Sequence, residues 1–188
     1  SGGDSIPVAA VSSPIETENT SETLAPTHTP QPTSTPTSTP DSTSTSDSES
    51  GAVLVTKWGT QGTGNGQFHH PNGVSLASDS SVYVAEWHNN RIQKFTSDGV
   101  FVTKWGTGGT GDGEFNSPAG VAVASDSSVY VAEVGNNRIQ KFTSDGMFIT
   151  KWGTKGSGDG EFARSQDVAV ASDGSVYVAD EENYRIQK

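Results

Sequence analysis

Three histidines fall in two short segments of this chain, close to a carboxylate. His69 and His70 are adjacent, and His88 follows Glu86 by two residues. Imidazoles that cluster beside a carboxylate can bind zinc or copper. A metal site needs three or four convergent ligands, however, and spacing along the chain does not guarantee convergence. The sequence therefore makes His69, His70 and His88 candidate metal ligands without assigning a cofactor.

An acidic residue precedes an arginine by five positions at three places. The pairs are Glu86 with Arg91, Glu133 with Arg138, and Asp180 with Arg185. A pairing that recurs at constant spacing favours a structural ion pair or turn brace over catalytic groups. The remaining residues support no Ser-His-Asp order, paired-carboxylate site or phosphate-binding loop. We therefore predict a chain with no catalytic residues and no cofactor.

These residues belong to a unit that repeats every 47 residues. The tetrapeptide Lys-Trp-Gly-Thr begins at Lys57, Lys104 and Lys151, and a Gly-rich loop, alternating apolar runs and Arg-Ile-Gln-Lys follow it each time. Short apolar runs separated by turn signals predict four antiparallel strands per unit. In the first full repeat the predicted strands are Gly73–Ala77, Val82–Ala85, Arg91–Thr96 and Val100–Trp105. No segment shows helical periodicity.

The first two strands of each unit are apolar on both faces and the outer two are more polar, which is typical of a propeller blade between neighbours. The segments Phe115–Val123, Val129–Glu133 and Asn136–Phe142 resemble the NHL repeat. The resemblance covers residues 53–188 and implies an all-β propeller, commonly six-bladed. The third copy departs from it, because Ser165-Gln166-Asp167 replaces Pro-x-Gly and Tyr184 replaces an asparagine. We therefore expect three four-stranded blades, half of a six-bladed ring.

The blades do not complete a ring by themselves. The third copy reaches only its third strand at Lys188, whereas Val53–Trp58 matches the fourth strand Val100–Trp105. Natural propellers have roughly four to eight blades and often pair strands from their two ends. Two interpretations follow: a homodimer whose chains exchange first strands in a six-bladed ring, or further repeats in a longer chain.

The repeats differ most in the loop before the first strand and in the loop between the second and third strands. In an antiparallel blade both loops lie at the same end. Their variable residues therefore share one face of the propeller, which we predict to be a ligand-binding face. Neutral drift of exposed loops is the alternative. The candidate residues of this loop face are His69, His70, Trp87, His88, Arg164, Glu181, Glu182 and Tyr184.

We expect this face to recognise a protein or glycan without catalysis, with aromatic Trp87 and Tyr184 as anchors. One alternative is a metal-dependent lyase or hydrolase, because the resemblance includes metal-dependent lyases with histidines at a central channel. The other alternative is a structural, self-assembling repeat protein.

Composition divides the chain into residues 1–50 and residues 51–188. The first part holds seven of the nine prolines, dense Ser and Thr, and no Trp, Phe, Tyr, Lys or Arg. Such a segment buries too little apolar surface to offset its ordering entropy, which predicts a disordered acidic segment, either a mucin-like stalk or an unmodified linker. Asn19-Thr20-Ser21 is an N-glycosylation sequon.

Charge and hydropathy limit the partners. The net charge is −11, and neither part has the basic footprint that nucleic-acid binding requires. No apolar run approaches the roughly 20 residues of a membrane span. The small, polar start Ser1-Gly2-Gly3-Asp4 ahead of a Pro-rich stalk resembles a mature surface lipoprotein. We therefore expect an extracellular or cell-surface protein, with lipid anchoring as one form of attachment.

Overall fold

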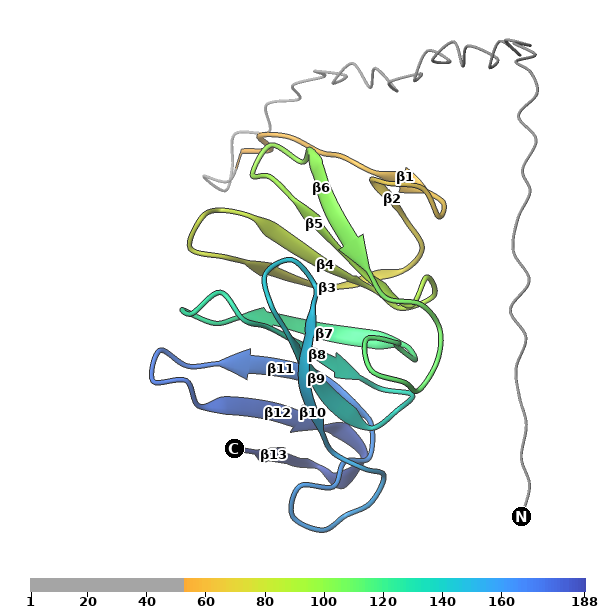
Figure 1. The fold of residues 1–188 in the computed structure, drawn as a ribbon, viewed down its shortest axis with the longest axis vertical. Helices are drawn as coiled ribbons and strands as arrows, with labels where there is room; N and C mark the ends of the chain where they lie inside the picture. The colour runs from red at the N-terminus through yellow and green to blue at the C-terminus, as the bar shows by residue number, and fades with distance from the viewer. Residues whose placement is uncertain (1–52) are drawn as a thin grey trace, which may run out of the picture. The chain divides into compact units, whose positions relative to one another are not determined.

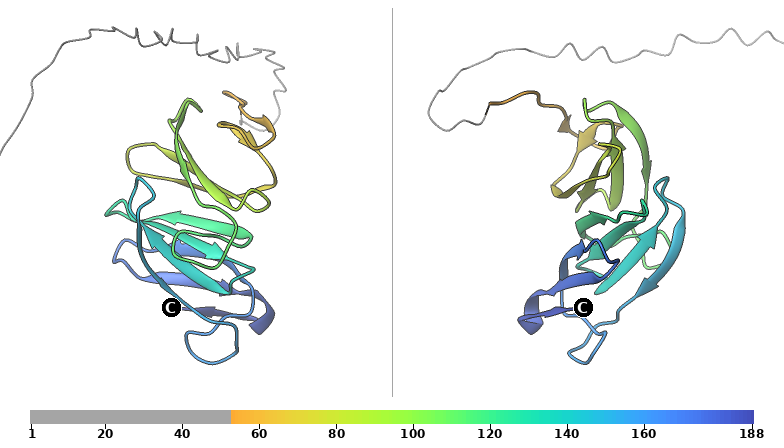
Figure 2. Two further views of the ribbon diagram at one scale, coloured as in Figure 1. Left: turned by 45° about the vertical axis from the view of Figure 1, so that its right-hand side comes forward. Right: turned by 90° about the vertical axis from the view of Figure 1, so that its left-hand side faces the viewer.

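The structure is a computed structural model that describes residues 53–188 (Figure 1). The predicted stalk and the Asn19 sequon lie outside the described residues. Within them the chain forms three successive antiparallel sheets. Figure 1 shows these sheets following one another in chain order, and both views in Figure 2 show the same order.

Each sheet is a blade in which neighbouring strands pair in sequence order. Blade one contains β3 (Pro71–Leu76), β4 (Val82–Glu86), β5 (Arg91–Phe95) and β6 (Phe101–Trp105). Blade two contains β7 (Pro118–Val123), β8 (Val129–Glu133), β9 (Arg138–Phe142) and β10 (Phe148–Trp152). Blade three contains β11 (Ser165–Val170), β12 (Val176–Asp180) and β13 (Arg185–Gln187). The all-β blade architecture is confirmed, with three strands rather than four in blade three.

Two small elements were not predicted. Strands β1 (Thr60–Gln61) and β2 (Gln67–Phe68) pair in parallel within the Gly-rich connector before blade one. A single 3-10 turn, Glu181–Asn183, joins β12 to β13. Both are too short to give a periodic signal in the sequence.

Apolar layers between the blades hold the stack together. Tyr83 and Ile92 of blade one pack with Phe115, Val131 and other residues of blade two in one buried cluster. A second cluster joins blades two and three through the corresponding residues, which include Tyr130 and Phe162. The first strands lie at the centre of this arrangement, because β7 contacts both β3 and β11. This stacking explains why the inner strands are apolar on both faces.

The two end blades each leave one apolar face exposed. In blade one, Val74 is 62% exposed, whereas its counterpart Val121 is buried at 5% against blade one. In blade three, Ile186 is 66% exposed, whereas Ile139 is fully buried. Each of these positions is thus covered where a neighbouring blade packs against it and exposed where none does.

The segment Val53–Trp58 has no strand partner among the described residues, so its predicted pairing with another chain or a further repeat stays a prediction. Residues 53–59 form no strand, and Val53, Leu54 and Val55 are exposed. A β-strand requires a partner for its backbone groups, and no described strand pairs with this segment. Only Trp58 makes a contact like that of its repeats: it packs near Phe95 with ring centroids 6.1 Å apart.

Candidate functional site

Two loops come together at one end of every blade. Loop A precedes the first strand (residues 69–70, 116–117 and 163–164), and turn B joins the second and third strands (residues 87–90, 134–137 and 181–184). Their backbones are hydrogen-bonded in each blade: Trp87 N–H donates to the His70 carbonyl at 3.0 Å, and Glu181 N–H donates to Arg164 at 3.1 Å. The predicted pairing of the two variable loops at one end is therefore present.

Loop A has one backbone conformation with different side chains. His70, Ser117 and Arg164 occupy equivalent positions with φ of 54°, 55° and 61°. This left-handed conformation is uncommon for residues other than glycine, asparagine and aspartate. Because it recurs in all three blades, it belongs to the framework of the fold rather than to one binding site.

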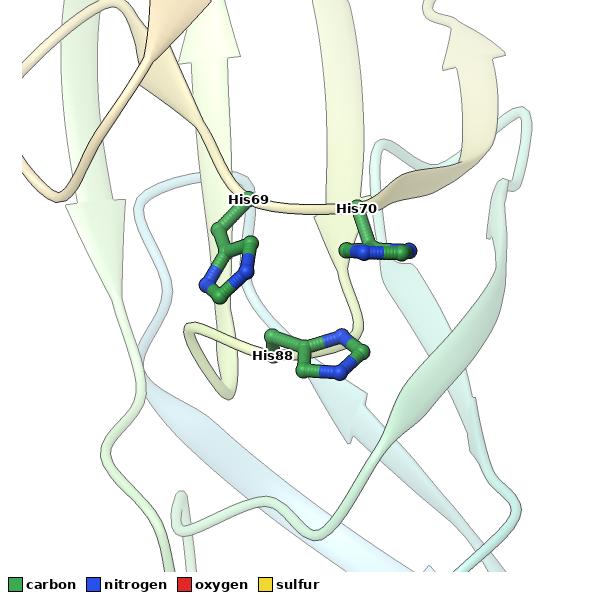
Figure 3. A group of neighbouring side chains, drawn as sticks. All are labelled: His69, His70 and His88. Atoms are coloured by element: carbon green, nitrogen blue, oxygen red, sulfur yellow. The ribbon is translucent and has the colours of Figure 1, made fainter.

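Blade one brings its three histidines together (Figure 3). The rings of His69 and His70 point from loop A toward His88 on turn B. The ring centroid of His88 lies 4.7 Å from that of His69 and 4.1 Å from that of His70. One nitrogen atom of each ring lies within 4.8 Å of the other two. His69 is half-buried, and His70 and His88 are exposed.

The neighbouring histidines affect the titration of His88. The pKa of His88 is below its usual value because of partial desolvation of the ring, followed by repulsion from His70 and His69. A second positive charge in so small a space is disfavoured. These contacts therefore favour the neutral form of the His88 ring relative to an isolated imidazole.

Glu86 does not act together with the histidine rings. Its buried carboxylate accepts hydrogen bonds from Asn89 Nδ2 at 2.6 Å, Arg91 Nε at 2.5 Å and Gln93 Nε2 at 2.8 Å. It also accepts one from the backbone N–H of His69 at 3.0 Å. With its oxygens engaged, this carboxylate positions loop A and is unsuited to be a fourth metal ligand.

The same network braces every blade. Arg91 donates to the carbonyls of Gly64 and Gln67 in the Gly-rich connector, and Gln93 also donates to Gln67. In blade two, Arg138 lies 2.6 Å from Glu133, and in blade three, Arg185 lies 2.8 Å from Asp180. These six residues thus form structural ion pairs that clamp the connector onto the blade. The part played by the glutamine of each Arg-Ile-Gln-Lys segment was not predicted. Its recurrence at the same position in every repeat could have indicated it.

The loops of blades two and three carry different chemistry. In blade two, the Ser117 hydroxyl donates to Asn116 Oδ1 at 3.3 Å. In blade three, Arg164 Nε lies 3.3 Å from Glu181, and its Nη1 lies 3.9 Å from Glu182. Tyr184 is 95% exposed on turn B, whereas Trp87 in blade one is half-buried.

Hydrogen bonds join the loops of successive blades into one continuous surface. Asn90 Oδ1 accepts from the backbone N–H of Ser117 at 2.9 Å, and Asn137 Oδ1 accepts from that of Arg164 at 2.9 Å. We call the surface formed by all three loops A and turns B the loop face. All eight predicted binding residues lie on it, in two groups: His69, His70, Trp87 and His88 on blade one, and Arg164, Glu181, Glu182 and Tyr184 on blade three.

Repeated four-stranded blades, stacked through apolar layers and braced by one recurring ion-pair network, define a β-propeller repeat protein. The NHL repeat family model matches residues 68–95, 115–142 and 162–188. The chain belongs to the NHL-repeat family. No curated protein matches the sequence.

Several solved structures are similar to this chain. A protein of unknown function from Bacteroides thetaiotaomicron is 19% identical with a TM-score of 0.51, over 57% of this chain and 32% of that one. A streptogramin B lyase is 19% identical with a TM-score of 0.49, over 62% and 36%. A gluconolactonase from Xanthomonas campestris is 17% identical with a TM-score of 0.47, over 62% and 36%. The chain thus spans about a third of their length, and the likeness concerns the fold. No helix among the described residues is long and apolar enough to cross a membrane.

Proposed function

We propose that this chain is a noncatalytic binding module that recognises a protein or glycan through the loop face. One observation carries this proposal: a single backbone arrangement of loop A and turn B presents different side chains on each blade. The framework beneath them, an acid, an arginine and a glutamine, is repeated three times. A repeated scaffold with varied, exposed loops is how many folds carry recognition.

Two aromatic residues are the expected anchors. Tyr184 is almost fully exposed and Trp87 is half-buried, so both offer apolar area to a partner. Tyr, Trp and Arg dominate the energetics of interfaces. Arg164, with Glu181 and Glu182 beside it, supplies polar selection at the blade-three end.

The experiment is a screen of the full chain against a glycan array and a display library of surface proteins, followed by variants. We expect Trp87→Ala and Tyr184→Ala each to weaken capture by about tenfold or more. Met147→Ala is the control, because Met147 is 70% exposed in the turn between β9 and β10, at the opposite end of blade two. Unchanged capture by both aromatic variants would show that the face is wrongly assigned.

The exposed faces of the end blades suggest that further blades cover them. A second copy of this chain and further repeats of a longer chain are both compatible with six blades. Sedimentation of the 188-residue chain distinguishes them: a concentration-dependent dimer supports the two-chain ring, and an exclusive monomer eliminates it. Filaments would favour the structural, self-assembling alternative.

We further propose that the blades are displayed outside the cell on the Ser/Thr/Pro-rich segment of residues 1–50. The support is compositional, because this segment holds most of the prolines and no Lys or Arg. Protease treatment of intact cells tests the proposal. Removal of the blade domain without lysis is the expected result, and complete protection until lysis would contradict it.

The lyase or hydrolase alternative rests on the histidine cluster. Such chemistry also needs a proton donor or acceptor beside the metal. Glu86, two residues before His88, is the carboxylate that the sequence offers for this proton transfer. Its oxygens are already engaged in the structural network. We therefore favour binding over catalysis.

A further inference from the structure

We propose that His69, His70 and His88 bind one late first-row transition-metal ion, zinc or copper(II), on the loop face of blade one. This site does not depend on the recognition function proposed above. Three features support it: the positions of the three nitrogen donors, the backbone that holds them, and the different residues in the loops of the other blades.

The separation of the donors fits a shared ion after small side-chain movements. Nitrogen ligands at about 2.0–2.1 Å from one tetrahedral zinc lie roughly 3.3–3.4 Å from each other. The three imidazole nitrogens already lie within 4.8 Å of one another. His70 and His88 are exposed, so rotation about their side-chain bonds can close the difference while the backbone stays in place.

Two hydrogen bonds hold the backbone of loop A in a position that directs His69 and His70 toward His88. The N–H of His69 donates to buried Glu86, and the carbonyl of His70 accepts from the N–H of Trp87. These two bonds fix the adjacent histidines against turn B, which carries His88. Preorganised ligands lose less conformational entropy when they bind an ion.

The ligand set selects the class of metal. Neutral imidazole suits zinc, copper and nickel, whereas calcium and magnesium prefer oxygen ligands. Glu86 is engaged in the ion-pair network, so three nitrogens and an open, solvent-facing position remain.

The other two blades show that the fold does not require imidazoles here. At the equivalent positions blade two has Asn116, Ser117 and Gly135, and blade three has Ala163, Arg164 and Glu182. Their loops close with similar backbone hydrogen bonds. The loops therefore fold without histidine at these positions, so the fold does not explain why blade one has three.

The experiment titrates the full chain, without an affinity tag, with zinc in a calorimeter. Cobalt(II) serves as a second probe, because its visible absorption reports ligand geometry. The test variant combines His69→Asn, His70→Ser and His88→Gly, which reproduces the residues of blade two. The control is His28→Asn, which removes the one remaining histidine of the chain, outside the described residues.

We expect the wild-type chain and the His28→Asn variant to bind one equivalent of zinc, and the triple variant to lose this binding. Each single histidine replacement should weaken binding by about tenfold or more. Circular dichroism of the triple variant should match wild type, because blade two folds with the same residues. Equal zinc binding by wild type and the triple variant, or no saturable binding by wild type, would overturn the proposal.

Discussion

Asn90 of blade one accepts a hydrogen bond of 2.9 Å from the backbone N–H of Ser117 in blade two. Asn137 repeats this bond one blade further along, to Arg164. The next residue of the series is Tyr184, whose side chain is exposed and cannot replace the amide in the same geometry. The hydrogen bond from loop A of one blade to the turn B asparagine of the preceding blade is thus present twice, at Asn90 and Asn137. Turn B of blade three has Tyr184 at this position instead.

Replacing Asn90 by alanine should destabilise the fold by about 1–3 kcal/mol, because the part-buried N–H of Ser117 loses its acceptor. Some of this loss reflects the left-handed backbone of Asn90, with φ of 49°. Asn90→Asp retains the acceptor and should retain most of the stability. Urea unfolding measures both, with Tyr184→Ala as a control expected to change the unfolding free energy by less than about 0.5 kcal/mol.

Glu133→Ala should destabilise the chain more than Asp180→Ala. Glu133 and Arg138 form a buried pair, so removing one partner leaves a buried charge and costs about 3–5 kcal/mol. In blade three the side chain of Arg185 is 29% exposed, so water can solvate it when Asp180 is lost. Equal losses in thermal or urea unfolding would contradict this difference.

Acid should weaken blade three through Asp180. Burial raises the pKa of this carboxyl, but hydrogen bonds from Asn183, the backbone of Ala163, Arg185 and Gln187 outweigh burial and lower it below 3.8. The unfolded chain then binds more protons in acid, so the stabilisation present above about pH 5 is lost as the pH falls through the folded-state pKa. Unfolding free energies measured across this range should fall less steeply for Asp180→Asn than for wild type.

Trp105→Ala should destabilise the chain by about 3–5 kcal/mol. The ring of Trp105 packs edge-on against Tyr83 within its own blade and lies 5.9 Å from Phe142 of the next blade. Trp58 occupies the same repeat position but is 39% exposed and packs only near Phe95 among the aromatic residues described. We therefore expect a smaller loss for Trp58→Ala, measured by the same unfolding experiment.

Gly120→Ala should disrupt the contact between blades two and three. A Cβ atom at Gly120 would lie 2.7 Å from Asp167 Cα and 2.9 Å from Val168 N, and backbone atoms cannot move aside cheaply. We expect a loss of about 1–3 kcal/mol. Gly108→Ala is the matched control, because its Cβ would meet nothing closer than Asn90 Nδ2 at 3.5 Å. Similar stability of the two variants would contradict this prediction, because it would mean that the contact adjusts to the added methyl group.

Much of the fold and part of the site could be predicted from local pattern. The period of 47 residues, the alternation of apolar residues and the turn signals determined the strands and the NHL repeat. The ion pair of Glu86 with Arg91 was also predictable, because antiparallel pairing sets Glu86 opposite Arg91 in the register of β4 and β5. Features of this kind depend on neighbours along the chain or across one hairpin.

Contacts between segments further apart were decided only by the tertiary structure. Spacing brought His88 to the same end of the blade as His69 and His70, but the hydrogen-bonded loops determined that their rings converge. The sequence could not show that the Glu86 carboxylate is unavailable to a metal. Its two oxygens accept hydrogen bonds from several donors, and only the folded structure shows which donors reach them. Nor could it show that Val53–Trp58 has no strand partner among the described residues, since a strand exists only where another backbone satisfies its hydrogen bonds.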